Sequence, residues 1–514
     1  MEKRLLLAIS LSFFVLFFWN LTHPPTRTFN AVRPNFLESE NRLTDPVPLT
    51  PEKAVPPDIN QKEELTTLNN SKLTVTFSNL GGSIKRIVMN EYNVSLPLTN
   101  FNQTENHNNL NYHIIEKNDF FIKYSANFEG NQIIKQYSLL PNEYIIKINI
   151  NTNFNKNSEI ISFRLDVSSL DKNERQSHDK SLLEYSIATT QKVVRKANAY
   201  KLSNKDMLNS KEQVSWLGFR DRYFCAIYKP LFKNEGYSTQ LDNDKLNFII
   251  EADNNVGNSL DAVLFFGPQD LSLLSSYPYD FDGIMRFSNF GILNSISKIV
   301  YKFLHFIYKI IPIWGICIIL TAIIVYLIMY PLSINGMKSM KKIQSLQPEI
   351  TKIREQHKNN PQKLQKETME LYKKHQVNPF GGCLPLLLQM PFFIGVYQVL
   401  WRSVAFKNAK FLWIKDLSQP DHLFAFPTSL PFVGEYFNIL PILMIIIMVI
   451  QQKFSAKNMV IADPAQESSQ KIMMFFFPLM IGFVFYNIAS GLALYFTTFY
   501  LLSSFTQWKI SKIT

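Results

Sequence analysis

The chain has 514 residues, a formal net charge of +12 and a mean hydropathy near zero. That average is typical of a soluble protein, but the apolar residues are segregated. The last 200 residues hold five long apolar runs, whereas residues 61–285 hold none. This pattern excludes a single water-soluble domain and predicts a membrane-embedded part joined to a soluble part.

The three cysteines, Cys225, Cys317 and Cys383, are far apart in the sequence. Their spacing excludes a disulfide framework and a cysteine-based metal site, so we interpret them as buried thiols. The soluble part has no Gly-x-Ser-x-Gly, no His-Glu-x-x-His and no phosphate-binding loop. The sequence therefore predicts a protein that is not an enzyme and has no cofactor or metal.

The N-terminus begins with a basic pair followed by an apolar run. Lys3 and Arg4 precede Leu5 to Leu21, and no small-residue cleavage site follows. We interpret residues 1–21 as an uncleaved signal-anchor transmembrane helix with its N-terminus in the cytoplasm. A cleaved signal peptide is the alternative. Residues 22–60 contain eight prolines and predict an extended linker.

Residues 61–285 predict a β-sandwich domain outside the cytoplasm. Residues 73–77 alternate between apolar and polar, Gly81-Gly82 is a turn signal, and residues 84–88 resume the alternation. Residues 144–150 and 246–250 show the same pattern. Many short strands separated by Asn and Gly turns are typical of a sandwich.

Residues 286–312 contain a predicted amphipathic helix, from 294 to 310. Its basic side chains recur at helical spacing on one face: Lys298, Lys302, His305 and Lys309. Its apolar side chains lie largely on the other: Ile296, Ile299, Val300, Phe303 and Ile307. This pattern favours a helix lying in the membrane interface, with packing on the β domain as the alternative.

Five further apolar segments predict transmembrane helices at 313–332, 378–403, 436–452, 472–489 and 490–508. With the anchor they make six spans, which places both termini in the cytoplasm. Residues 404–435 then form a periplasmic loop, while 453–471 and 509–514 are a cytoplasmic loop and tail. The fold class is a six-span α-helical membrane protein with a five-helix core and a periplasmic β-sandwich.

Residues 333–377 carry ten Lys and Arg residues and predict a basic cytoplasmic helical hairpin broken at Asn359-Asn360-Pro361. Its basic face could dock anionic lipid, ribosomal RNA or a targeting factor, or could serve only to fix the topology. The residues that carry it are Lys338, Lys341, Lys342, Lys352, Arg354, Lys373 and Lys374. The segment 402–435 departs from the charge rule, because it carries Arg402, Lys407, Lys410 and Lys415 outside.

Residues 378–391 read NPFGGCLPLLLQMP and lead from a turn into a predicted span. Pro385 and Pro391 each remove a backbone donor, and Gln389 lies between them. Freed carbonyls and a side-chain amide need polar partners within a bilayer. This span should therefore face protein or a wet cavity on one side.

A series of short motifs runs through the last 200 residues. They are Ile328-Met329-Tyr330-Pro331-Leu332, Leu346-Gln347-Pro348, Asn378-Pro379 with Gly381-Gly382-Cys383, Pro385-Leu386-Leu387 with Gln389-Met390-Pro391, Leu412-Trp413-Ile414 with Asp416-Leu417, Gln470-Lys471-Ile472-Met473, and Ser490-Gly491-Leu492 with Leu494-Tyr495. In order and spacing they resemble the YidC family of bacterial membrane-protein insertases, within the wider Oxa/Alb superfamily. The resemblance is weaker in the outer domain, at Gly81-Gly82 and Tyr223-Phe224.

The resemblance implies a membrane-protein insertase and folding chaperone of the bacterial inner membrane that works without nucleotide, alone or with the Sec translocon. It implies nascent membrane proteins, the ribosome, targeting factors and anionic lipids as partners, and not DNA. The implied site is a hydrophilic groove within the bilayer. Here its lining would be Tyr326, Gln389, Tyr495, Thr497, Thr498 and Ser503, of which Gln389 and Tyr495 fall on motif positions.

The sequence departs from the family pattern at one groove position. The family places an arginine four residues before the Tyr-Pro-Leu string, where this chain has Tyr326. Three other classes were weighed: a small-solute transporter, an integral-membrane hydrolase and a plain anchor. No inverted repeat, intramembrane charge or catalytic cluster supports the first two. A plain anchor does not account for the basic hairpin.

Overall fold

The computed structural model describes thirteen stretches of the chain: 63–96, 98–104, 110–128, 130–152, 160–166, 184–197, 206–242, 245–253, 259–357, 360–377, 384–430, 434–457 and 464–512. The predicted signal anchor (1–21) and linker (22–60) lie outside the described residues, as does the turn at 378–383.

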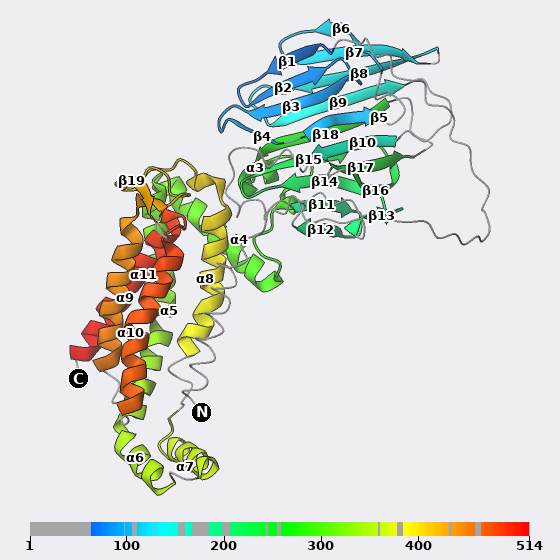
Figure 1. Ribbon diagram of the computed structural model, residues 1–514. Helices are drawn as coiled ribbons and strands as arrows, with labels where there is room; N and C mark the ends of the chain where they lie inside the picture. The colour runs from blue at the N-terminus through cyan, green and yellow to red at the C-terminus, as the bar shows by residue number, and fades with distance from the viewer. Residues whose placement is uncertain are drawn as a thin grey trace, which may run out of the picture. The chain divides into compact units, whose positions relative to one another are not determined.

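Two antiparallel nine-stranded sheets make up the β domain (Figure 1). The first has the order β1-β2-β3-β5-β10-β17-β16-β13, with β4 paired to β3. Its strands are β1 (Leu65–Asn69), β2 (Leu73–Ser78), β3 (Ser83–Met89), β4 (Val94–Leu96), β5 (Leu98–Thr104), β10 (Ile160–Asp166), β13 (Asn209–Ser210), β16 (Asn234–Asp242) and β17 (Lys245–Ala252).

The second sheet has the order β12-β11-β14-β15-β18-β9-β8-β7-β6. Its strands are β6 (His113–Lys117), β7 (Phe121–Phe128), β8 (Asn131–Leu139), β9 (Ile145–Thr152), β11 (Glu184–Thr189), β12 (Val193–Ala197), β14 (Val214–Arg220), β15 (Phe224–Pro230) and β18 (Ser259–Pro268). The strands predicted at 73–77, 84–88, 144–150 and 246–250 correspond to β2, β3, β9 and β17, so a β-rich domain is confirmed.

The turn between β2 and β3 requires glycine. Gly81 and Gly82 have φ angles of 70° and 53°, which side chains with a Cβ rarely adopt. A Cβ on Gly82 would also lie 3.0 Å from the ring of Tyr112. The glycine pair therefore allows both the reversal of the chain and the close packing of Tyr112.

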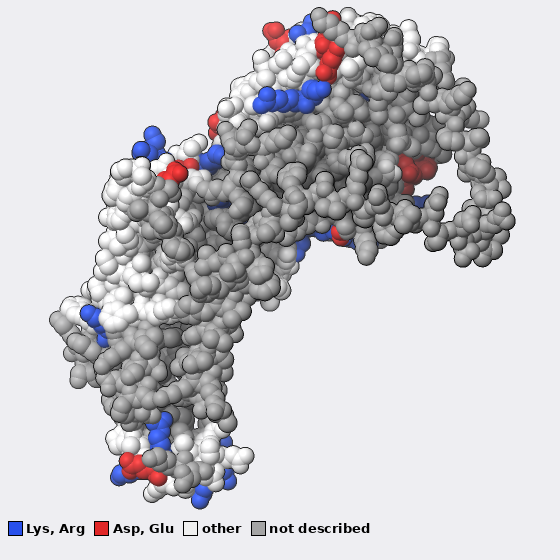
Figure 2. Space-filling model, in the orientation of Figure 1, with Lys and Arg blue, Asp and Glu red and all other residues white. Residues whose placement is uncertain are grey.

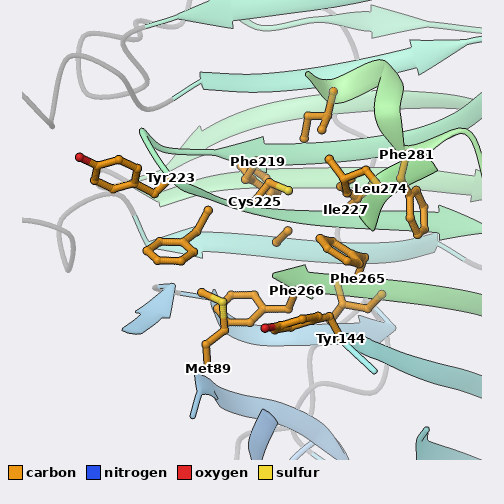
Figure 3. Packing of buried hydrophobic residues seen from close by; sticks show 14 of the residues in the cluster. Met89, Tyr144, Phe219, Tyr223, Cys225, Ile227, Phe265, Phe266, Leu274 and Phe281 are labelled. Atoms are coloured by element: carbon orange, nitrogen blue, oxygen red, sulfur yellow. The ribbon is translucent and has the colours of Figure 1, made fainter. Parts of the chain in front are cut away.

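The core of the β domain is aromatic and aliphatic (Figure 3). The ring of Phe265 lies 6.2 Å from that of Tyr144 and 5.7 Å from that of Phe281. Cys225 is fully buried in the same core, and both Cys225 and Cys317 are free thiols. The prediction of buried thiols is confirmed for these two, while Cys383 lies outside the described residues.

A buried ionic cluster joins β11 to β14 and β12. The Glu184 carboxylate lies 3.0 Å from Arg220 Nη2 and 3.2 Å from Arg195 Nη1. Burial alone would raise the pKa of Glu184, but the two guanidinium groups outweigh it and hold that pKa below its ordinary value. Arg220 also donates to the carbonyl of Arg286 at 2.9 Å, which fastens the segment leading out of the domain.

Three helical elements follow β18, the last strand of the β domain: α3 (Leu271–Ser276), η5 (Phe281–Ile284) and α4 (Gly291–Ile310). Tyr301 of α4 donates from its hydroxyl to Asp270, the N-cap of α3, at 2.9 Å. α4 also packs against the helix α8 (Leu384–Arg402), where Ile296 of α4 lies next to Gly395 of α8. Its outward side exposes a stripe of apolar residues: Ile292, Ile299, Phe306 and Ile310. α4 thus contacts the β domain and also presents an apolar surface; its placement in the membrane interface stays a prediction.

The remaining helices form a bundle with a hairpin at one end (Figure 1). The bundle comprises α5 (Trp314–Ser345), α8 (Leu384–Arg402), α9 (Ile439–Lys457), α10 (Pro464–Phe485) and α11 (Ser490–Lys512). The hairpin comprises α6 (Gln347–Gln356) and α7 (Pro361–Lys374), and the other end carries η7 (Val404–Phe406), β19 (Phe424–Leu430) and β20 (Gly434–Phe437).

Within the described stretches, one helical segment is long and apolar enough to cross a membrane, Trp314–Gly336. Ile439–Phe454 and Phe475–Phe485 are shorter apolar helices. The count of six spans therefore stays a prediction.

Several helix bounds differ from the predicted ones. α5 continues through Pro331 to Ser345, because a proline removes one backbone hydrogen bond and can kink a helix without ending it. α10 begins at Pro464, within the predicted cytoplasmic loop, because proline is favoured in a first helical turn. The predicted loop 404–435 contains β19, whose Pro427 weakens the strand signal.

Candidate functional site

Three bundle helices share an aromatic cluster at the predicted groove. Phe393 of α8 lies 5.1 Å from Phe499 of α11 and 6.3 Å from Tyr495, ring to ring. Tyr326 of α5 lies 5.5 Å from the same Phe499. Residues from three distant parts of the chain therefore converge around Phe499.

Two polar side chains near this cluster are buried without a hydrogen-bond partner. Gln389 is 8% exposed, and Tyr495 is 0% exposed. The Gln389 Nε2 and the Tyr495 hydroxyl both lack a partner among the described residues. An unsatisfied buried polar atom costs about 1–3 kcal/mol. Gln389 lies four residues, about one helical turn, before Phe393, on the same face of α8. These two atoms mark a place that can hold water or a polar segment of a ligand.

Tyr326 is also buried, but its hydroxyl is satisfied. It donates to the Thr506 side chain of α11. The position that resembles the family's arginine site therefore holds a neutral side chain that links α5 to α11.

The other three candidate residues do not join this cluster. The hydroxyls of Thr497 and Thr498 donate to their own helix, to the carbonyls of Ala493 at 2.7 Å and Leu494 at 2.8 Å. Ser503 accepts a hydrogen bond from Gln451 of α9 at 2.9 Å. The structure therefore brings Tyr326 and Tyr495 to the same ring, Phe499, with Gln389 one helical turn from Phe393, and it places Ser503 between α9 and α11.

Sequence reasoning missed Thr506 and Gln451. Thr506 follows Tyr495 by eleven residues, about three helical turns, so both lie on one face of α11. That spacing could have identified Thr506. Gln451 is the second-last residue of the predicted span 436–452, and its pairing with Ser503 depends on the packing of α9 against α11.

The hairpin of α6 and α7 closes over a small apolar cluster of Leu346, Leu371 and Val377, with Ile343 and Ile350 packed against it. A short ion pair adds to it: His357 Nε2 lies 2.8 Å from Glu367. Lys, Arg, Asp and Glu side chains are visible among uncharged residues at this end of the molecule (Figure 2). Of the predicted hairpin residues, Lys338 and Lys342 lie on the last turns of α5 and not on the hairpin, and both are exposed. Lys352, Lys373 and Lys374 are exposed on the hairpin itself, and Arg354 is half-buried. The Lys341 side chain lies outside the described parts.

The chemistry open to the aromatic cluster is neutral hydrogen bonding. Gln, Tyr and Thr side chains are uncharged near pH 7 and can donate and accept. Among the described residues, no group of His, Cys, Asp and Glu side chains could hold a metal ion.

Two family models match the chain. Residues 99–303 match the YidC periplasmic domain, and residues 306–514 match the family described as 60Kd inner membrane protein. A membrane protein insertase YidC from Francisella philomiragia is 35% identical over 317 residues, covering 60% of this chain and 52% of that protein. One from Chlorobium limicola is 28% identical over 497 residues, covering 88% of this chain and 83% of that protein.

The chain spans about half the length of several relatives, including 50% of the YidC insertase from Chlorobaculum tepidum. A solved structure described as an active YidC insertase covers 87% of this chain and is itself 93% covered, at 19% identity and a TM-score of 0.39. The matches to both family models, in the order β domain and then helices, and the agreement with insertase relatives over most of the chain establish the family. The chain belongs to the YidC family.

Proposed function

We propose that this chain is a membrane-protein insertase and folding chaperone of the bacterial inner membrane. Its substrates would be nascent membrane proteins, and its site would be a hydrophilic groove among α5, α8 and α11. The observation that carries the proposal is the pair of buried atoms without partners, Gln389 Nε2 and the Tyr495 hydroxyl, beside Tyr326. The insertase relatives support the same function.

The groove would act by reducing a desolvation cost. A polar segment of a substrate is expensive to move into hydrocarbon, by several kcal/mol for each unsatisfied backbone group. The Gln389 amide can donate a hydrogen bond to this polar segment, and the Tyr495 hydroxyl can donate or accept one. Water can fill the rest of the site. The apolar part of the substrate then moves into lipid.

This groove would work without a fixed charge. Tyr326 is neutral. α5 contains no Lys, Arg, Asp or Glu between Trp314 and Met337, and α11 contains none between Ser490 and Gln507. Selectivity would therefore depend on the hydrogen-bonding needs of the substrate more than on its acidic residues.

The proposed topology has six spans, with both termini and the α6–α7 hairpin in the cytoplasm. The β domain would lie in the periplasm, and α4 would lie at the periplasmic surface of the inner membrane. The hairpin would contact the ribosome, targeting factors or anionic lipid, and the Sec translocon would be a partner for some substrates. Thr497, Thr498 and Ser503 would contribute to the groove only after a change in their hydrogen bonds.

Photo-crosslinking during insertion tests the groove. A crosslinking residue at Gln389 or Tyr495 should capture a small two-span substrate while it inserts. The matched control is Ile446 of α9, an apolar residue that is 50% exposed on the outside of the bundle. Equal capture at all three positions, or capture only at Ile446, would show that the substrate does not pass through the proposed groove.

Charge reversal tests the hairpin. Lys338, Lys342, Lys373 and Lys374 are exposed, so their change to Glu should leave the hairpin's apolar cluster intact. We expect insertion to fall. Cysteine labelling from each side of the membrane must show an unchanged topology, because so large a charge change could invert it. Full activity with correct topology would remove the docking role.

A further inference from the structure

Four basic residues in the predicted periplasmic segment 402–435 oppose the usual charge distribution of membrane proteins. They differ in their surroundings. Lys410 and Lys415 are exposed, whereas Arg402 and Lys407 are partly buried. Arg402 is the last residue of α8, and Lys407 follows the short helix η7. The partly buried pair needs an explanation, because burying a charge is costly unless it has a partner.

Arg402 has no such partner in the described part of the chain. Its Nε is buried without a hydrogen-bond partner, and no acid there forms a salt bridge with it. It lies within electrostatic range of Arg220, Arg222 and Glu184. Glu184 is already held by Arg220 at 3.0 Å and by Arg195. The Glu184 carboxylate is therefore already paired with the guanidinium groups of Arg220 and Arg195.

Arg222 is a third cation beside Arg402, after Lys407. Its Nε donates to the Trp401 carbonyl at 2.8 Å, and its guanidinium carbon lies 3.7 Å from the centroid of the Trp401 ring. The same guanidinium lies 4.6 Å from the ring of Tyr223. Lys407 Nζ lies 5.6 Å from the rings of both Tyr223 and Phe224. Arg222 and Lys407 therefore meet at one aromatic ring, next to Arg402.

Two of the three acids of the same loop, Asp416 and Asp421, are engaged elsewhere. Asp421 Oδ2 accepts hydrogen bonds from the amides of Ile439 and Leu440, at the start of α9, and from the Trp413 indole. Asp416 accepts from the amide of Ser418 at 2.8 Å. These carboxylates build the loop and do not neutralise Arg402 or Lys407.

The position of these cations indicates what kind of anion they bind. α8 has 19 residues and is about 28 Å long, close to the thickness of a bilayer core. Tyr397 and Trp401 stack at its end, and such aromatic residues are typical of the headgroup region. α4, which packs on α8, exposes Ile299 and Phe306 alongside. An anion at Arg402 would therefore lie at the depth of lipid headgroups.

We propose that Arg402 and Lys407, with Arg222 held between two aromatic rings, bind the phosphate of an anionic phospholipid in the outer leaflet. A guanidinium and an ammonium group can both donate to phosphate oxygens, and the partly desolvated setting strengthens that contact. The site lies at the opposite end of α8 from the basic hairpin. It rests on α8 spanning the membrane and does not depend on insertase activity.

Native mass spectrometry of the full-length protein in detergent tests the site, with phosphatidylglycerol, phosphatidylcholine or inorganic phosphate added. We expect Arg402→Gln/Lys407→Gln to bind one tightly held phosphatidylglycerol fewer than the wild type. The matched control is Lys410→Gln/Lys415→Gln, which removes the same charge from exposed positions of the same loop and should bind as the wild type does. Equal loss in both variants would refute a defined site.

Thermal unfolding provides a second measurement on the same samples. Phosphatidylglycerol should raise the unfolding midpoint of the wild type above that in phosphatidylcholine, because a ligand that binds only the folded state stabilises it. The Gln variant should lose this increment, and Arg402→Lys/Lys407→Arg, which keeps the charge, should retain most of it. The proposal fails if the Gln variant keeps the increment, if phosphatidylcholine gives the same one, or if inorganic phosphate reproduces it.

Discussion

Glu184 and Gln389 are both buried polar residues, yet the protein treats them differently. In the β domain, the Glu184 carboxylate has Arg220 at 3.0 Å and Arg195 at 3.2 Å. Lys135, fully buried in the same domain, donates to the Gly81 carbonyl at 2.7 Å. In the helical bundle, Gln389 Nε2 and the Tyr495 hydroxyl have no partner among the described residues.

We propose that this difference separates Glu184 and Lys135, which support folding, from Gln389 and Tyr495, which are available for function. A buried charge without a partner would destabilise the β domain, and Glu184 and Lys135 each have one there. A buried amide or hydroxyl without a partner destabilises the bundle by about 1–3 kcal/mol. Water or substrate that supplies the missing hydrogen bond would remove this penalty. Substitutions in the two regions should therefore have opposite effects on stability and insertion.

The largest loss of stability is expected for Glu184→Gln. It leaves Arg220 and Arg195 buried without a carboxylate and should lower the free energy of unfolding by about 3–5 kcal/mol. Lys72→Gln is the control, because the Lys72–Glu91 pair is exposed and worth at most about 1 kcal/mol. Thermal unfolding of both variants in detergent measures the difference. Equal losses would mean that burial does not decide the value of these pairs.

Asp270→Asn should have an intermediate effect and should change the pH dependence of stability. Burial would raise the pKa of Asp270, but hydrogen bonds from His305, the Leu273 amide and Tyr301 outweigh it and lower that pKa. A carboxyl with a lowered pKa in the folded state stabilises it above the ordinary value, 3.8, and loses that contribution as pH falls through the folded-state pKa.

The variant should therefore cost about 1–3 kcal/mol at neutral pH, because it weakens the link between α3 and α4. Its unfolding midpoint should also fall less steeply than that of the wild type below pH 4. Unfolding scans from pH 7 to pH 3 provide the measurement. Parallel curves for the two proteins would show that Asp270 does not carry this part of the acid sensitivity.

The smallest effect is expected at Tyr326. Tyr326→Phe removes the hydrogen bond to Thr506 and should cost about 0.5–1.5 kcal/mol, with a modest loss of insertion. Tyr326→Arg should be tolerated, because a long side chain can reach water or the cytoplasmic rim from a wet groove. Expression and thermal unfolding of the two variants decide the matter. Failure of Tyr326→Arg to fold would place this position in a dry core.

Local patterns were sufficient to predict much of the fold. Alternation and glycine turns identified β2, β3, β9 and β17, and the break at Asn359-Asn360-Pro361 predicted a hairpin that α6 and α7 form. The order of strands in the sheets could not be predicted, because pairs such as β10 with β17 and β9 with β18 join distant segments. No local pattern contains that information.

The candidate site shows the same limit. The sequence identified Gln389 as a candidate site residue from its position between two prolines, because a polar residue within a transmembrane span is costly and often functional. The contact between Arg222 and Trp401 was not, because it joins residues 179 positions apart. Four basic residues in the segment 402–435 were visible as an exception to the charge rule, but only their burial separates Arg402 and Lys407 from Lys410 and Lys415.

We propose that Gln389 Nε2 and the Tyr495 hydroxyl, which have no partner among the described residues, serve function and not folding. The most direct test measures unfolding and insertion on one variant, Gln389→Leu, which has a similar size and no polar atoms. The account predicts that insertion of a two-span substrate falls about tenfold or more while the unfolding midpoint is unchanged or higher. A variant that inserts normally, or one that loses stability and insertion together, would contradict it.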